Sequence, residues 1–119
     1  MAKILAVDDS PSMRKMVHTT LSSGGHEVIL ADDGEHALEK ANQEDVELVI
    51  TDVYMPKLDG ISLVHELRKL ENYKYIPMLM LTTESSSEMK MKGKNAGATG
   101  WIVKPFVPKS LLATIDKVL

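Results

Sequence analysis

The chain has 119 residues, 44% of them hydrophobic, which is enough for one ordinary domain with its own core. Its formal net charge of −3 lacks the basic excess of proteins that bind nucleic acid or anionic membranes. It has no cysteine, which excludes disulfides and thiolate metal sites, and no apolar run approaches the ~20 residues of a membrane helix. We therefore expect a soluble, cytoplasmic monomer with one domain over residues 1–119.

The first half of the chain alternates apolar runs with helical patterns. The runs predict buried strands, because they are apolar on both faces. Ser10 and Pro11 open the first helix, and Asp32 stands at capping-box spacing from Glu35 in the second. In chain order we expect a strand over Lys3–Val7, a helix from Pro11 to Gly24, a strand over His26–Ala31, a helix opened by Asp32, and a strand over Val46–Asp52.

The second half continues this alternation, with one weak helix. The pattern after Ser85, which stands at capping-box spacing from Glu88, has few apolar residues, and Gly93 inside it costs ~1 kcal/mol relative to alanine. In chain order we expect a helix over Ile61–Leu70, a strand over Ile76–Thr82, the weak helix over Ser85–Asn95, a strand over Thr99–Val103, and a helix from Pro108.

Five strands that alternate with five helices predict an α/β fold. Strands joined by crossover helices pair in parallel, so we expect a five-stranded parallel sheet with helices on both faces. Helices reach both faces only if the chain reverses its direction along the sheet. In such folds, ligands bind at this reversal, beyond the carboxyl ends of the strands.

Polar residues follow four of these strand ends. Asp8 and Asp9 follow the first strand, Asp52 ends the third, Thr82 the fourth, and Lys104 follows the fifth. Three carboxylates at one edge repel each other unless a cation lies between them. Oxygen ligands alone favour a hard cation, Mg²⁺ before Ca²⁺. A metal, a lysine and a hydroxyl around one carboxylate predict a phosphoryl-transfer site, with Asp52 as the nucleophile.

The order of these motifs resembles one known family. The chain is similar over essentially its whole length to the receiver domain of bacterial two-component response regulators, and most of all to the single-domain chemotaxis (CheY-like) type. This resemblance implies a flavodoxin-like, doubly wound sheet of strand order 2-1-3-4-5. The motifs that carry it are Asp8–Asp9, Asp52, Met55–Pro56, Asp59–Gly60, Thr82 and Lys104–Pro105–Phe106.

The resemblance implies a phosphoacceptor switch rather than an enzyme. Asp52 would accept the phosphoryl group of a histidine kinase in a Mg²⁺-dependent reaction. Lys104 would pair with that group or, before phosphorylation, with Asp52, and the Lys104–Pro105 bond is expected to be cis. Asp8 would act mainly through water. The Mg²⁺ ligands would be Asp8, Asp9, Asp52 and the backbone carbonyl of Tyr54.

The resemblance also implies how the signal leaves the site. Thr82 would move toward the phosphoryl group, and the aromatic side chain of Trp101 would swing inward. Tyr54 and Glu84 would influence the lifetime of the phosphorylated state. With no output domain of its own, the protein would act through the surface of its last two helices and the strand between them. The partner would be a protein such as a flagellar motor switch component.

Two other functions compete with this interpretation. A Mg²⁺-dependent phosphatase with an aspartyl-phosphate intermediate would share the predicted site. Such enzymes typically place a second aspartate two residues after the nucleophile, where this chain has Tyr54. A flavodoxin-like mononucleotide binder would need a glycine- or hydroxyl-rich loop after the first strand, where this chain has Asp8 and Asp9 instead.

Overall fold

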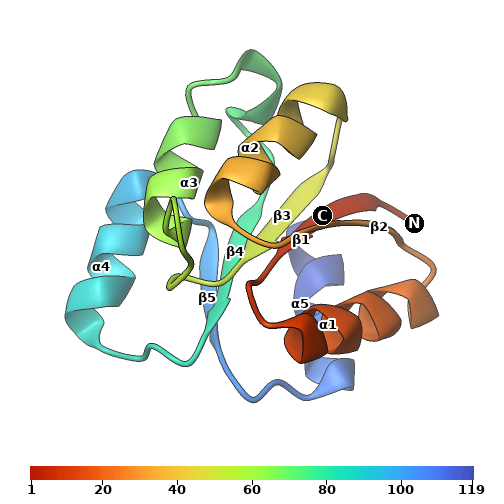
Figure 1. The fold of residues 1–119 in the computed structure, drawn as a ribbon. Coiled ribbons are helices and arrows are strands. Elements are labelled where there is room, and N and C mark those ends of the chain that lie inside the picture. Colours follow the sequence, from red (N-terminus) through yellow and green to blue (C-terminus); the bar gives the residue numbers. More distant parts are fainter.

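The computed structural model, which describes residues 1–119, contains one parallel sheet of strand order β2-β1-β3-β4-β5 (Figure 1). Its strands are β1 (Lys3–Val7), β2 (Glu27–Ala31), β3 (Leu48–Thr51), β4 (Met78–Thr82) and β5 (Gly100–Val103). Its helices are α1 (Pro11–Ser23), α2 (Gly34–Gln43), α3 (Gly60–Leu67), α4 (Ser87–Ala96) and α5 (Pro108–Val118), with a short 3₁₀ turn at Glu71–Tyr73. The predicted fold class and strand order are confirmed.

Two layers of helices cover the sheet. Helices α2, α3 and α4 lie on one face, and α1 and α5 lie on the other (Figure 1). Successive strand residues point to opposite faces, so β1 contributes Leu5 to the first core, and Ile4 to the second. Every residue of β3 and β4 is buried, which explains why these strands read as continuous apolar runs.

Strand register brings the polar strand ends to one edge of the sheet. Val7 pairs with Thr51, and Thr82 pairs with Val103. The backbone ladder continues one residue further, because the Asp52 N–H donates to the Val7 carbonyl at 3.0 Å and the Lys104 N–H donates to the Thr82 carbonyl at 2.8 Å. Side chains far apart in the sequence therefore start from fixed positions at this edge.

Two predicted helix caps are wrong by one residue. Asp33, not Asp32, caps α2 by accepting the His36 N–H at 2.8 Å, while Asp32 bonds the His36 side chain. Ser86, not Ser85, caps α4 by accepting the Met89 N–H at 3.2 Å. In both cases two neighbouring residues of the same type could cap the helix. The second of them does so, because it has the extended backbone that directly precedes the first helical turn.

Helix α3 begins and ends earlier than predicted. Asp59 caps it and accepts the Ser62 N–H at 2.8 Å. It ends at Leu67 rather than Leu70, and the side chain of the next residue, Arg68, donates to three backbone carbonyls, those of Tyr73, Ile76 and Gly97. Those carbonyls lie at the end of the 3₁₀ turn, just before β4 and just after α4, so Arg68 joins three segments.

Helix α4 has one buried residue, Gly93. A Cβ atom at this position would lie 2.7 Å from Cζ3 of Trp101, so the helix needs glycine where the indole ring packs against it. The sequence pattern treats Gly93 only as a helix weakness, whereas the structure gives it a packing role.

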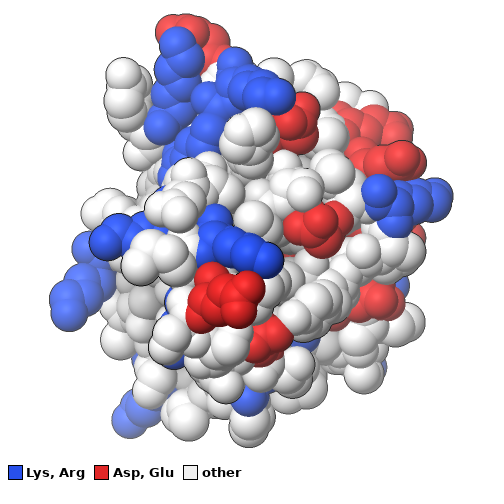
Figure 2. All heavy atoms as spheres, turned by 90° about the vertical axis from the view of Figure 1, so that its left-hand side faces the viewer, with Lys and Arg blue, Asp and Glu red and all other residues white.

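The face of α3 and α4 carries mixed charge. Figure 2 shows acidic side chains among the basic ones rather than one continuous basic surface. Lys69 pairs with Glu66 at 2.9 Å, and Lys92 pairs with Glu88 at 3.7 Å. None of the helices is long and apolar enough to cross a membrane.

Candidate functional site

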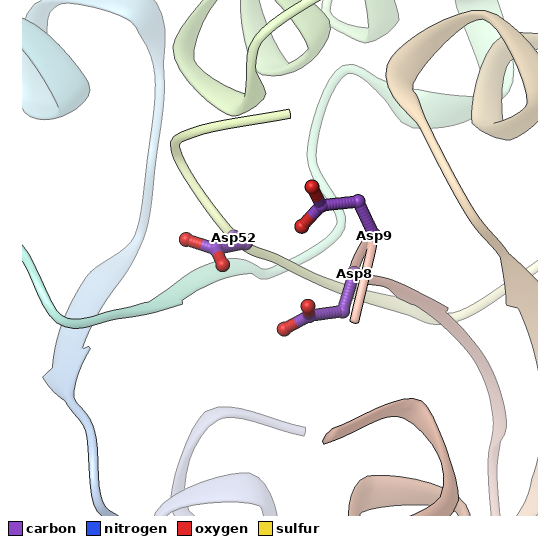
Figure 3. A group of neighbouring side chains, drawn as sticks. All are labelled: Asp8, Asp9 and Asp52. Carbon is purple, nitrogen blue, oxygen red and sulfur yellow. The ribbon is translucent and has the colours of Figure 1, made fainter. Parts of the chain in front are cut away.

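Three aspartates meet at the carboxyl edge of the sheet (Figure 3). Asp8 and Asp9 follow β1, and Asp52 follows β3. One carboxylate oxygen from each lies within 4.8 Å of those of the other two. The structure therefore brings together the three carboxylates that the sequence predicts, and with Lys104 they form what we call the acidic site.

Lys104 enters this site from β5. Its Nζ lies 2.7 Å from Oδ2 of Asp8 and 2.8 Å from Oδ2 of Asp52, and its side chain is only 9% exposed. Burial by itself lowers the pKa of Lys104. The hydrogen bonds to Asp52 and Asp8 together raise this pKa by more than burial lowers it, so the pKa of Lys104 stands above its ordinary value. The pairing with Asp52 agrees with the expectation, and the bond to Asp8 was not predicted. The Lys104–Pro105 bond is cis, as expected.

The loop after β3 fixes the carboxylate of Asp52. Its Oδ1 accepts the Val53 N–H at 2.7 Å, so its Oδ2 is the oxygen that faces Lys104. The Gly60 N–H donates to the Val53 carbonyl at 2.8 Å and closes the loop. A Cβ atom at position 60 would lie 1.8 Å from the backbone oxygen of Asp52, so only glycine fits there. This close approach explains the Asp59–Gly60 motif.

Thr82 and Trp101 both contact Glu84. Thr82 is fully buried, and its Oγ1 accepts the Glu84 N–H at 3.2 Å. The indole Nε1–H of Trp101 donates to the Glu84 carbonyl at 2.8 Å. The Tyr54 hydroxyl donates to the Glu84 carboxylate. The sequence points to all four residues, but it carries no signal that Thr82, Trp101 and Tyr54 all bond to Glu84.

The donor set of the acidic site fits a hard divalent cation. All available ligands are oxygens, and three carboxylates with one lysine leave an excess of negative charge. The backbone carbonyl of Tyr54 accepts no hydrogen bond within the protein, so it is also free to act as a ligand. Asp8, Asp9 and Asp52 lie close enough together to bind one cation, and the assignment of these three and the Tyr54 carbonyl as Mg²⁺ ligands stays a prediction.

The known proteins that are similar to this chain are of two kinds, namely longer proteins and proteins of about the same length. A probable transcriptional regulator, ycf27 of Porphyridium aerugineum, is 45% identical over 117 residues, which are 98% of this chain and 48% of the relative. The chain thus spans about half the length of the curated relatives of this kind. The chemotaxis protein CheY4 of Vibrio cholerae is 52% identical with a TM-score of 0.96, over 100% of this chain and 99% of that one.

A third similar structure is the receiver domain of a sensor histidine kinase from Pseudomonas aeruginosa, solved with a magnesium ion coordinated in its active-site cleft. It is 28% identical with a TM-score of 0.91, over 98% of this chain and 96% of that one. Residues 4–116 of the present chain match the family described as the response regulator receiver domain. With the fold, the strand order and the acidic site all in agreement, the chain belongs to the response regulator receiver domain family.

Proposed function

We propose that this protein is a response regulator that accepts a phosphoryl group on Asp52 from the phosphohistidine of a histidine kinase. The observation that carries the proposal is the position of Lys104, whose ammonium bonds Asp52 and Asp8 beside the third carboxylate, Asp9. A nucleophilic carboxylate, a cation-binding cluster and a fixed positive charge are the parts that phosphoryl transfer needs.

The residues of the acidic site supply the following chemistry. A carboxylate oxygen of Asp52 attacks phosphorus, the new P–O bond forms, and the P–N bond to the kinase histidine breaks, with the electron pair leaving on nitrogen. The Lys104 ammonium moves from the carboxylate to the phosphoryl oxygens and offsets their charge. Thr82 donates its hydroxyl proton to one of these oxygens. Asp8, Asp9, Asp52 and the Tyr54 carbonyl would hold Mg²⁺, which when bound would supply positive charge that offsets the charge of the phosphoryl group.

We further propose that the phosphorylated protein acts by binding a partner in chemotaxis, such as a flagellar motor switch component. The support is the likeness to a chemotaxis protein over nearly the whole of both chains. The phosphatase alternative has no comparable support. The position two residues after Asp52 holds Tyr54, whose hydroxyl already donates to Glu84, so no carboxylic acid stands there to protonate a leaving group.

The phosphoacceptor is tested by incubating the protein with Mg²⁺ and acetyl phosphate and measuring its intact mass. We expect one added phosphoryl group in the wild type, none in Asp52→Asn, and none when a chelator removes the metal. Asp116→Asn is the matched control, because Asp116 is an exposed carboxylate of α5. The proposal fails if the wild type gains no mass with acetyl phosphate or a cognate kinase, or if Asp52→Asn gains the same mass.

The switching role is tested by partner binding. Titration of a motor switch component should show tighter binding to the phosphorylated protein than to the unmodified one. A partner that binds both forms equally cannot be controlled by phosphorylation, so equal affinities would contradict this role.

A further inference from the structure

We infer that Arg14 is a positioning residue of the acidic site, and that it acts by fixing the peptide group between Asp8 and Asp9. Its Nη1 donates to the backbone carbonyl of Asp8 at 2.7 Å. This bond goes to the main chain rather than to a carboxylate, so Arg14 acts on the site through the chain. The inference deepens the proposed function, on which its biological meaning rests, but the positioning itself is a property of the unphosphorylated protein.

Helix α1 brings Arg14 to the end of β1. Ser10 caps this helix, and the Arg14 N–H donates to the Ser10 carbonyl at 2.9 Å, so Arg14 closes the first turn. Side chains of a helix lean toward its amino end, and Arg14 therefore reaches back over that turn. It lines a small cavity between α1 and the sheet, together with Val17 of α1 and Leu81 of β4. Arg14 is half-buried there, and its guanidinium faces the end of β1.

Asp8 is held at every polar group, and Arg14 supplies one of these contacts. The Asp8 N–H donates to the Ala31 carbonyl at 3.2 Å, Oδ1 accepts the Ser10 N–H at 2.9 Å, and Oδ2 bonds Lys104 at 2.7 Å. Arg14 is the one donor to the Asp8 carbonyl. Asp8 is only 5% exposed, and a carbonyl that loses its donor in such a place costs free energy. Without Arg14, this peptide group would turn toward water.

Asp9 depends on that peptide group for its own position. Neither its backbone nor its carboxylate has a hydrogen-bond partner in the protein. Figure 3 shows that its carboxylate nevertheless points toward Asp52. The peptide bond is planar and rigid, so the direction of the Asp8 carbonyl fixes the direction of the bond to the Cα atom of Asp9. Arg14 therefore sets the position of the one carboxylate of the acidic site that has no bond of its own.

Charge and position predict opposite effects of Arg14 on a bound cation. The guanidinium is positive, so by charge alone it repels Mg²⁺, and its removal would tighten Mg²⁺ binding. If Arg14 positions Asp9, its removal weakens Mg²⁺ binding, because a residue that orients a ligand typically contributes at least tenfold to metal affinity. The sign of the change therefore separates the two roles.

The first experiment titrates Mg²⁺ into the unphosphorylated, ¹⁵N-labelled protein and follows its amide resonances by NMR. Arg14→Met keeps an unbranched apolar stem in the cavity but has no donor, and it should raise the Kd for Mg²⁺ about tenfold. The ¹⁵N resonance of Asp9 should also shift before Mg²⁺ is added, because a hydrogen bond to a carbonyl polarises its peptide group. Arg14→Lys keeps a charged donor and should bind Mg²⁺ more tightly than Arg14→Met does.

Lys15→Met is the matched control. It removes one positive charge from the next residue of α1, which is exposed. It should leave the Asp9 resonance in place and should not weaken Mg²⁺ binding. Urea unfolding checks that each variant is folded, and Arg14→Gln, with a shorter side chain, replaces Arg14→Met if the latter is not. The inference is overturned if the folded variant binds Mg²⁺ as tightly as the wild type or more tightly, or if the Asp9 resonance does not move.

A second experiment measures phosphorylation by acetyl phosphate, through intact mass, over a range of Mg²⁺ concentrations. Arg14→Met should need about tenfold more Mg²⁺ than the wild type for half-maximal phosphorylation, and excess Mg²⁺ should restore it. If the wild type is phosphorylated and the two Mg²⁺ curves coincide, the inference is wrong and the proposed function stands. If neither protein is phosphorylated while the first experiment succeeds, the proposed function is wrong and the positioning role of Arg14 stands.

Discussion

Helices α3 and α4 pack against each other on one face of the sheet, yet they are held there in different ways. The inward face of α3 consists of Leu63, Val64 and Leu67, none of which is exposed. Helix α4 is longer but buries only Gly93. Hydrophobic burial therefore fixes α3 along its length, whereas α4 depends on contacts at a few points.

Besides the apolar packing of Met89 and Ala96, α4 is held by a few local contacts at its start, middle and end. Ser86 caps its first turn, and Trp101 packs on its middle. At its carboxyl end, Nε and Nη2 of Arg68 donate to the Gly97 carbonyl at 3.1 and 2.8 Å. Apolar burial is lost only when a whole surface separates, but a hydrogen bond is lost by a small displacement. The comparison teaches that α4 depends less on apolar burial than α3 does, which is typical of the less stable elements of a fold.

The largest expected effect tests the burial of α3. Leu67→Ala should lower the free energy of unfolding by ~2–5 kcal/mol, because it leaves a cavity in a fully buried layer. Met89→Ala in α4 should cost less than about half of that, since Met89 is only partly buried. Urea denaturation measures both. Equal losses would mean that α4 contributes to the core as α3 does, and the comparison would be wrong.

The next effect tests the carboxyl end of α4. Arg68→Gln should cost ~1–3 kcal/mol, because partly buried carbonyls lose their donors. Amide hydrogen exchange should rise in the last turn of α4 more than in α3. Lys69→Gln is the control, since this neighbour makes only an exposed ion pair with Glu66 and should change stability by less than ~0.5 kcal/mol. Unchanged exchange in α4 would show that Arg68 does not hold this end.

A third prediction reverses the ordinary rule for glycine in a helix. Gly93→Ala should destabilise the protein by ~1–3 kcal/mol, because the new methyl group would overlap the indole of Trp101. In a Trp101→Ala background the same substitution should instead stabilise it by ~1 kcal/mol, as alanine usually does. Thermal or urea unfolding of the four proteins gives the sign. If Gly93→Ala stabilises the protein in both backgrounds, the indole of Trp101 is not the reason why position 93 needs glycine.

The smallest effect is the pH dependence of the bond beside α4. The pKa of Glu84 is lowered in the fold, so its contribution is present above the unfolded carboxyl pKa and lost as pH falls through the folded value. The pKa of Tyr54 is raised, so its contribution is present below the unfolded phenol pKa and lost as pH rises through the folded value. Trp101 is the only tryptophan, and its indole donates to the Glu84 carbonyl. Acrylamide quenching of its fluorescence should therefore be lowest on a plateau between the two ranges.

Two variants separate the sides of that plateau. Glu84→Gln should remove the acid side only, because glutamine does not ionise, and Tyr54→Phe should remove both sides. A wild-type profile that is flat across both ranges would contradict the bond between Tyr54 and Glu84.

The sheet and the acidic site were predictable because their signals are strong and local. Asp8, Asp52 and Lys104 each stand at the end of an apolar run, and parallel strands place such ends on one edge. What sequence reasoning missed depends on side chains that meet only in the fold. The bond from Lys104 to Asp8 spans 96 residues, and the bond from Tyr54 to Glu84 spans 30.

The wrong caps have a simpler origin. Asp32 and Asp33, and Ser85 and Ser86, are equivalent by type, and only the extended backbone of Asp33 and Ser86 decides which side chain faces the open turn. Gly93 was misjudged for a third reason. Its benefit comes from the size of Trp101, which no helical periodicity records.

Gly60 carries a consequence for the tolerance of this protein to mutation. It has no chemistry of its own, but its backbone lies against the carbonyl of Asp52 so closely that no side chain fits. In a library that places every amino acid at position 60, functional variants should therefore be as rare as in the same library at position 52. Only the residue at position 52 carries the chemistry itself. Any design that transplants this loop to another scaffold must carry the glycine together with the aspartate.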